Sequence, residues 1–362
     1  MRVMVMVKAT KNSRQESWYA KEAEEAARFY ASIFPDSRVD RVTPLQSDSP
    51  SGPPGSVKVV SLAKNTRERE LLEARATVPS ANGSCAPGGA TRPGENVSAV
   101  RSEPLEGGYA PVNGIQMYYE VHGRRHGVPL VLLHGGGSTI EVTFSKVLPV
   151  FARGRRVIAV EEQGHGRTTD RDQPLTFESS ADDVAALLRQ LEVGEADVLG
   201  FSNGASVALQ VAIRHPQLVR KLIFASSITK REGARPQLWE FMKQADFSNM
   251  PQPLKDAFLR VNPDLQKLKT MHDKDAARMR TFEDVPEDAV RSVRAPTLIV
   301  LGDQDVVKPE HAVEMTRLIS GARLLVLPGG HGDYLGEAVM TRKASRYPEL
   351  TARLIEEFLD EQ

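Results

Sequence analysis

The feature that most constrains the fold is a regular alternation of short apolar runs with helical segments, from about residue 115 to the end of the chain. The apolar runs occupy residues 115–121, 129–133, 156–160, 197–201, 221–225, 296–301 and 323–327. Helical patterns occupy residues 177–193, 203–214, 311–318 and 350–359. This order predicts an α/β fold, a mostly parallel sheet with helices on both faces.

Length and composition limit the alternatives. A chain of 362 residues suits one large domain with an extension, or two domains. Lys plus Arg and Asp plus Glu each number 47, and a net charge of zero disfavours binding to nucleic acid or to an anionic membrane. Cys85 is the only cysteine, so an internal disulfide and a Cys₂His₂ zinc site are excluded. Without a membrane span or a signal peptide in the sequence, we expect a cytoplasmic protein.

The chain changes character before residue 109. Residues 78–108 are crowded with Pro, Gly, Ser and Ala and have no apolar period, which predicts a flexible linker. Before it, residues 1–77 form an N-terminal extension, with expected strands at 4–7 and 57–62 and a helix at 23–34. After it, residues 109–362 form the main domain. Within that domain the alternation stops at 229–293, where an insert of helices is expected.

The strongest motif is Gly200-Phe201-Ser202-Asn203-Gly204, which follows a predicted strand and opens a predicted helix. This is the context of a nucleophile elbow, a tight turn that lifts a serine hydroxyl off the end of a sheet. The helix N-terminus beside the serine favours developing negative charge.

A second motif, His134-Gly135-Gly136-Gly137, ends the strand predicted at 129–133. Glycines let backbone N–H groups approach a ligand closely. We therefore expect the N–H groups of Gly136 and Asn203 to form an oxyanion hole, and His134 to be structural.

A serine nucleophile needs a base, and the base needs an orienting carboxylate. His331 follows the last predicted strand, and Asp305 follows the strand before it, so both lie at carboxyl ends of strands, where open α/β sheets place their sites. Asp303 is a competing choice for the acid, and we favour Asp305.

These motifs together resemble the α/β-hydrolase superfamily, specifically its lidded esterase-like members, from about residue 108 onward. The segment from Glu162 to Thr168 is similar to the family's D-x-x-G-H-G-x-S segment, with a glutamate near the usual aspartate. We interpret it, including His165, as shaping a loop. The resemblance implies the triad Ser202–Asp305–His331, with residues 229–293 as a cap over the acyl pocket. From the apolar residues of the cap we expect Trp239, Phe241, Phe258 and Phe282 to line that pocket.

The N-terminal extension resembles fragments of two other families. Its opening MRVMVMVKA is similar to the first strand of a YCII-related domain, and AEEAARFYASIFPDSRV to part of a PhnB-like domain of the glyoxalase superfamily. That superfamily uses His and Glu metal ligands, yet the first histidine of the chain is His122. A metal-dependent lyase or resistance protein is therefore disfavoured.

The function expected is a serine hydrolase that cleaves small to medium carboxylic esters through an acyl-enzyme, without a metal or another cofactor. Lactonase, C–C hydrolase and cofactor-free perhydrolase or haloperoxidase activities on the same fold stay open, as does a non-catalytic binding protein on a hydrolase scaffold. The sequence leaves the oligomeric state open.

Overall fold

The computed structural model describes residues 3–5, 37–44, 57–64, 104–339 and 345–361. The chain divides into two compact units, Met1–Gly94 and Glu95–Gln362. No helix in these described ranges is long and apolar enough to cross a membrane.

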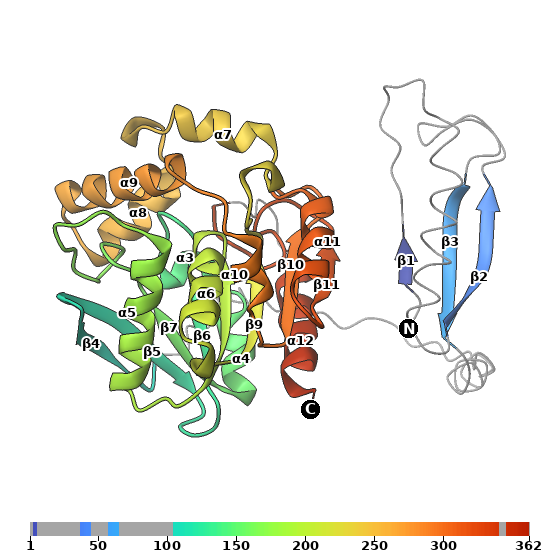
Figure 1. Ribbon diagram of the computed structural model, residues 1–362, viewed down its shortest axis with the longest axis horizontal. Helices are drawn as coiled ribbons and strands as arrows, with labels where there is room; N and C mark the ends of the chain where they lie inside the picture. Colours follow the sequence, from blue (N-terminus) through green and yellow to red (C-terminus); the bar gives the residue numbers. More distant parts are fainter. Residues whose placement is uncertain (1–2, 6–36, 45–56, 65–103, 340–344, 362) are drawn as a thin grey trace, which may run out of the picture. The chain divides into compact units, whose positions relative to one another are not determined.

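The N-terminal unit contains a three-stranded antiparallel sheet in the order β1-β3-β2 (Figure 1). Its strands are β1 (Val3–Val5), β2 (Ser37–Pro44) and β3 (Val57–Lys64). The strands predicted at 4–7 and 57–62 overlap β1 and β3, whereas β2 was not predicted. The predicted helix at 23–34 and most of the predicted linker lie outside the described residues.

The second unit is built on an eight-stranded sheet in the order β11-β10-β9-β8-β6-β7-β5-β4. Its strands are β4 (Glu106–Val112), β5 (Ile115–Gly123), β6 (Leu130–Leu133), β7 (Arg156–Val160), β8 (Ala196–Phe201), β9 (Val219–Ala225), β10 (Thr297–Gly302) and β11 (Arg323–Leu327). From β7 to β11 all neighbours are parallel, and β4 and β5 add an antiparallel edge. The predicted mostly parallel sheet is confirmed.

Helices cover both faces of this sheet (Figure 1). One face carries α5 (Phe177–Gln190), α6 (Asn203–Arg214), α10 (Glu287–Arg291) and α11 (Pro309–Leu318). The other carries α3 (Ile140–Phe144), α4 (Leu148–Gly154) and α12 (Tyr347–Asp360). Every residue of β6, β8 and β10 is buried, because strands covered on both faces can expose neither side.

The antiparallel edge corrects two sequence expectations. Strand β4 was not predicted, and residues 106–108, assigned to the linker, pair with β5. A turn at Asn113 and Gly114, with φ of 44° and 86°, joins the two strands, and Asn-Gly is a strong hairpin signal. Gly107 fits the strand because a Cβ there would lie 2.9 Å from the carbonyl oxygen of Tyr119. Pairing with β5 therefore overrides the weak strand propensity of Gly107 and Gly108.

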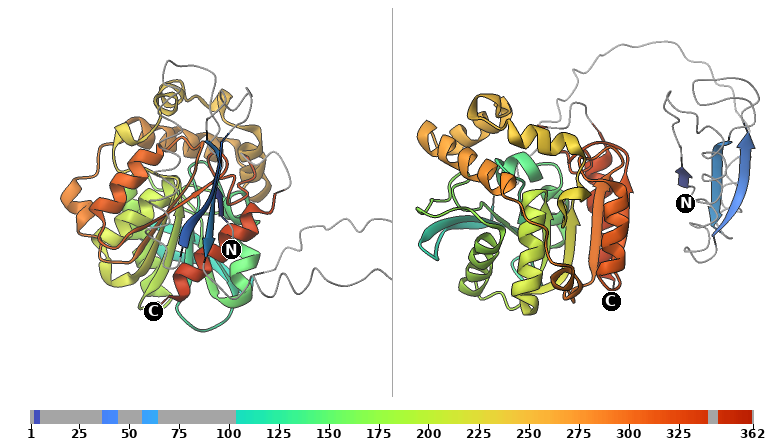
Figure 2. Two further views of the ribbon diagram at one scale, coloured as in Figure 1. Left: turned by 90° about the vertical axis from the view of Figure 1, so that its right-hand side faces the viewer. Right: turned by 45° about the horizontal axis from the view of Figure 1, so that its top comes forward.

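The segment between β9 and β10 supplies a helical cap, here residues 229–293. Its helices include α7 (Pro236–Lys243), α8 (Gln252–Val261) and α9 (Leu265–Arg280), with short 3₁₀ turns at Arg231–Gly233 and Phe247–Asn249. Figures 1 and 2 show these three helices, coloured yellow to orange, over one end of the sheet. The cap has a small apolar cluster of its own, formed by Met250, Phe258, Leu268 and Met271. Helix α7 contains no buried residue, whereas α9 contains six, so the cap is packed less uniformly than the sheet.

Candidate active site

The turn between β8 and α6 holds Ser202 in an unusual backbone conformation, with φ 53° and ψ −122°. Its flanking glycines have a steric cause. A Cβ on Gly200 would lie 2.1 Å from the carbonyl oxygen of Gly204, and a Cβ on Gly204 would lie 2.2 Å from that of Leu133. The turn therefore closes only with glycine on both sides, as a nucleophile elbow requires.

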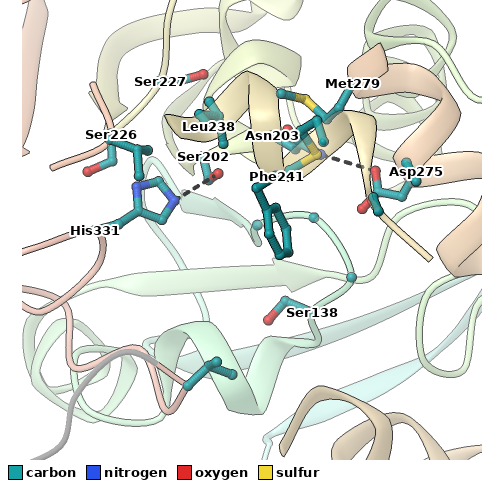
Figure 3. Close-up of a pocket in the computed structure, with 18 of the residues that line it drawn as sticks. Ser138, Ser202, Asn203, Ser226, Ser227, Leu238, Phe241, Asp275, Met279 and His331 are labelled. Carbon is teal, nitrogen blue, oxygen red and sulfur yellow. Dashed lines mark hydrogen bonds between the residues drawn. The ribbon is translucent and has the colours of Figure 1, made fainter. Parts of the chain in front are cut away.

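Ser202, His331 and Asp305 form one hydrogen-bonded line, of which Figure 3 shows the contact between Ser202 and His331. His331 Nε2 lies 3.1 Å from Ser202 Oγ, and His331 Nδ1 lies 2.8 Å from Asp305 Oδ1. Burial opposes a charge on His331, but the Asp305 carboxylate outweighs it and raises the pKa of His331. Burial likewise opposes the charge of Asp305, yet the His331 imidazole and further hydrogen bonds hold its pKa below the ordinary value. Their contact thus stabilises the imidazolium form of His331 and the ionised form of Asp305.

Asp303, the competing choice for the acid, makes a different contact. Asp303 Oδ1 accepts a hydrogen bond from the Gly329 N–H at 2.8 Å, and the Asp303 side chain is exposed. Asp303 therefore stabilises the loop that carries His331, whereas Asp305, which is fully buried, contacts the imidazole itself.

A buried polar chain behind Asp305 was missed from the sequence. Ser226, directly after β9, donates to Asp305 Oδ2, and its Oγ lies 2.6 Å from the hydroxyl of Tyr334. The Val307 N–H donates to the other carboxylate oxygen at 3.2 Å. Ser226, like Ser202, has a positive φ, here 52°, a signal that appears only in the folded backbone. These partners fix the carboxylate in one orientation.

The two predicted oxyanion residues lie together. A Cβ on Gly136 would lie 2.4 Å from Asn203 Nδ2, and a Cβ on Gly135 would lie 3.5 Å from the Ser202 Cβ. The glycine loop after β6 thus packs against the elbow, which is where a donor to a tetrahedral oxyanion has to be.

His134 holds this loop in place. It is fully buried, and burial lowers its pKa to about 4, so the ring is neutral. Its Nδ1 lies 2.8 Å from the Gly135 carbonyl oxygen, and its Nε2 accepts from the Glu162 N–H at 3.1 Å. The ring links the glycine loop to the segment after β7, in agreement with a structural role.

A cavity of about 600 Å³ lies over Ser202. Apolar residues dominate its cap-side wall, and they include Leu238, Phe241, Met242, Met250, Leu254, Met279 and Phe282. Figure 3 shows Phe241, Met279 and Leu238 around Ser202.

Two of the four aromatic residues expected in the pocket, Phe241 and Phe282, line this cavity, and two do not. Phe258 is wholly buried in the cluster inside the cap. The Trp239 ring packs under the Arg231 guanidinium, 3.9 Å from its centroid, and its Nε1 donates to the Arg231 carbonyl. His272 of α9 also lines the cavity.

No group of three or more His, Cys, Asp or Glu side chains that could hold a metal ion occurs within the ranges that the structure describes.

Comparison with known proteins identifies the second unit. Residues 128–278 match a family described as alpha/beta hydrolase fold. The pimeloyl-[acyl-carrier protein] methyl ester esterase of Neisseria meningitidis is 30% identical over 57% of this chain and 72% of its own length. The chain belongs to the α/β-hydrolase superfamily. With serine at its elbow, it is a serine hydrolase of that fold.

Other relatives of this α/β-hydrolase differ in what their names say they act on. The 2-hydroxymuconate semialdehyde hydrolase of Pseudomonas sp. strain CF600 is 28% identical over 60% of this chain and 90% of its own length. The enol-lactonase from Burkholderia xenovorans LB400 superposes with a TM-score of 0.57 at 21% identity, covering 70% of this chain and all of that one. The fold is thus shared by hydrolases of several bond types.

The N-terminal extension matches a different family. Residues 13–81 match a model described as 3-demethylubiquinone-9 3-methyltransferase. The extension therefore has the glyoxalase-like character that its resemblance to a PhnB-like domain predicts, and it is a separate module joined to the hydrolase.

Proposed function

We propose that this hydrolase cleaves small to medium, uncharged carboxylic esters through an acyl-enzyme on Ser202. The observation that carries the proposal is the line from Ser202 through His331 to Asp305 at the floor of a largely apolar cavity. A serine hydroxyl is a weak nucleophile alone, and a base 3.1 Å from it that is oriented by a buried carboxylate makes it a strong one.

The reaction would follow from this geometry in two halves. Ser202 Oγ attacks the ester carbonyl while its proton passes to His331 Nε2, and the N–H groups of Gly136 and Asn203 bind the oxyanion. Collapse of the tetrahedral intermediate expels the alcohol, which takes the proton from His331. Water then attacks the acyl-enzyme by the same route and releases the acid. Asp305 keeps its charge throughout and stabilises the imidazolium.

The cavity wall supports the choice of an uncharged substrate. Its cap side presents leucine, methionine and phenylalanine side chains, which favour burial of an alkyl or aromatic group. Among the lining residues that the structure describes there is no Lys or Arg to receive an anionic group such as a muconate carboxylate. A lactone is an uncharged cyclic ester and would use the same steps, so lactonase activity is the second candidate.

Labelling with a fluorophosphonate, followed by a panel of substrates, tests the proposal. We expect covalent modification at Ser202 and turnover of nitrophenyl acetate to octanoate, with a γ-lactone and an anionic dienoate in the same panel. Faster turnover of the dienoate than of every ester would contradict the ester assignment. A protein that takes no label and hydrolyses none of the panel would support the non-catalytic alternative.

A further inference from the structure

A buried charged cluster lies on the side of Ser202 opposite His331, and the proposed reaction does not use it. Asp275 projects from cap helix α9 into the cavity wall, as Figure 3 shows, and is only 7% exposed. Its Oδ1 accepts from Asn203 Nδ2 at 3.1 Å, so a cap side chain is hydrogen-bonded to the residue that follows the nucleophile.

The same carboxylate lies against the glycine loop. A Cβ on Gly136 would lie 2.6 Å from Asp275 Oδ2, as well as 2.4 Å from Asn203 Nδ2. The Gly136 backbone therefore packs flat against the hydrogen-bonded pair of side chains. The two residues assigned to the oxyanion hole thus share one neighbour, and that neighbour comes from the cap.

Arg278, one turn further along α9, anchors the carboxylate. It donates to Asp275 Oδ1 from Nε at 3.1 Å and from Nη2 at 2.5 Å, and its Nη1 donates to Glu162 Oε2 at 3.1 Å. Burial opposes the charge of Asp275, but the Arg278 guanidinium holds its pKa well below the ordinary value. Arg278, which Glu162 shares, weakens the repulsion between the Asp275 carboxylate and a developing oxyanion.

The segment that follows β7 also takes part in this cluster, through Glu162 and His165. Glu162 pairs with Arg278, and His165 Nε2 accepts from the Gly137 N–H at 3.2 Å and lies 3.6 Å from Asp275 Oδ2. The segment therefore contacts helix α9 through Glu162 and His165, and His165 also contacts Gly137 of the glycine loop. Displacement of α9 would disturb both oxyanion residues together.

We propose that Asp275 is a positioning residue for the oxyanion hole, so that the cap completes the hydrolytic site as well as lining it. The carboxylate holds the Asn203 carboxamide against the glycine loop and fixes the Gly136 and Asn203 backbones relative to each other. This inference rests on the proposed function, and it assigns to the cap a part of transition-state binding.

Asp275→Ala and Asn203→Ala test the proposal, with Asp273→Ala as the matched control. Asp273 lies on the same helix, is half exposed and contacts Lys269 and His272 rather than Asn203 or Gly136. The readouts are kcat and KM for nitrophenyl butyrate and the calorimetric Kd of butylboronic acid. This inhibitor adds to Ser202 Oγ as a tetrahedral boronate and places an oxygen in the oxyanion hole.

We expect each test variant to lower kcat about ten- to hundred-fold, below the loss of a whole oxyanion donor, with KM within about threefold. The boronic acid should bind more weakly by a similar factor, and Asp273→Ala should behave as the wild type. Because both changes act through one contact, the double variant should be no slower than about the slower single variant.

Three results would overturn the inference. These are a wild-type kcat and boronate Kd in Asp275→Ala, fully additive losses in the double variant, or a raised KM with unchanged kcat, which would make Asp275 a substrate contact. If Asp275→Ala does not fold, Asn203→Ala decides alone, and a wild-type kcat in it refutes the proposal. Fluorophosphonate labelling of the wild type separates the two proposals. Labelling with unaffected variants refutes only the positioning role, and absence of labelling refutes both.

Discussion

The sheet and the cap of this hydrolase contribute to one cavity but are built differently. The proposed reacting groups Ser202, Asp305 and His331 follow β8, β10 and β11, whose positions are fixed by strand pairing and two large apolar clusters. The cap has one small cluster and a helix, α7, with no buried residue. The proposed chemistry is therefore positioned by the sheet, and about half of the residues that line the cavity come from the more lightly packed cap.

Substitution of the nucleophile should produce the largest effect. We expect Ser202→Ala to lower kcat for a nitrophenyl ester by at least about 10⁴-fold without loss of folding, because the base would have nothing to activate. Ser206→Ala is the control, since the Ser206 hydroxyl also lines the cavity but bonds to Ser227 at 2.8 Å. Activity of Ser202→Ala within tenfold of the wild type would show that the residue after β8 is not the nucleophile.

The two candidate acids should differ by orders of magnitude. Asp305→Asn should lower kcat about 10⁴-fold, because an amide at that position favours the wrong tautomer of His331. Asp303→Asn should stay within about tenfold, since an amide oxygen at 303 can still accept from the Gly329 N–H. Steady-state kinetics of both variants would check this, and the reverse order would transfer the role to Asp303.

The pH dependence should report the raised pKa of His331. Only the neutral imidazole can accept the Ser202 proton, so kcat/KM should fall about tenfold per pH unit below that pKa. Because Asp305 raises the pKa, the midpoint of this acid limb should lie above the ordinary histidine value of about 6.5. An acid limb centred at or below that value would show that burial outweighs the carboxylate.

Substitution of two phenylalanines of the cap should distinguish a residue that packs the cap from one that contacts substrate. Of the changes considered, these should have the smallest effect on kcat. Phe258→Ala should lower the free energy of unfolding by about 3–5 kcal/mol, because the ring is fully buried in the cap cluster. Phe241→Ala should leave stability unchanged and raise KM several-fold, because the ring is 48% exposed and lines the cavity. Denaturant unfolding and KM measurements check both, and equal stability losses would show that α7 is part of a continuous core.

The sheet could be predicted because its signals are local. Each reacting side chain follows an apolar run, and parallel strands bring their carboxyl ends to one edge of the sheet. The sequence also favoured Asp305 over Asp303, although both lie in one short loop, and only the folded loop shows which of them contacts His331.

The cap could not be predicted to the same depth. Apolar character alone does not distinguish Phe258, which faces its own helices, from Phe241, which faces the cavity, since that depends on how helices separated along the chain pack together. The contact of Asp275 with Asn203 joins residues 72 positions apart, and no pattern in either segment indicates it. Ser226 and Tyr334 were missed for the same reason, as their partners lie on other strands and loops.

The left-handed backbone at Ser202 has a consequence for how such a chain would evolve. A φ of 53° in a residue with a Cβ costs on the order of 1–3 kcal/mol, and glycine would adopt it freely. Replacing Ser202 with glycine should therefore raise the melting temperature while ending hydrolysis. The fold alone would favour the inactive residue, so only continued selection for turnover keeps a serine there, and in a lineage released from that selection we expect glycine at this position before any change in the sheet around it.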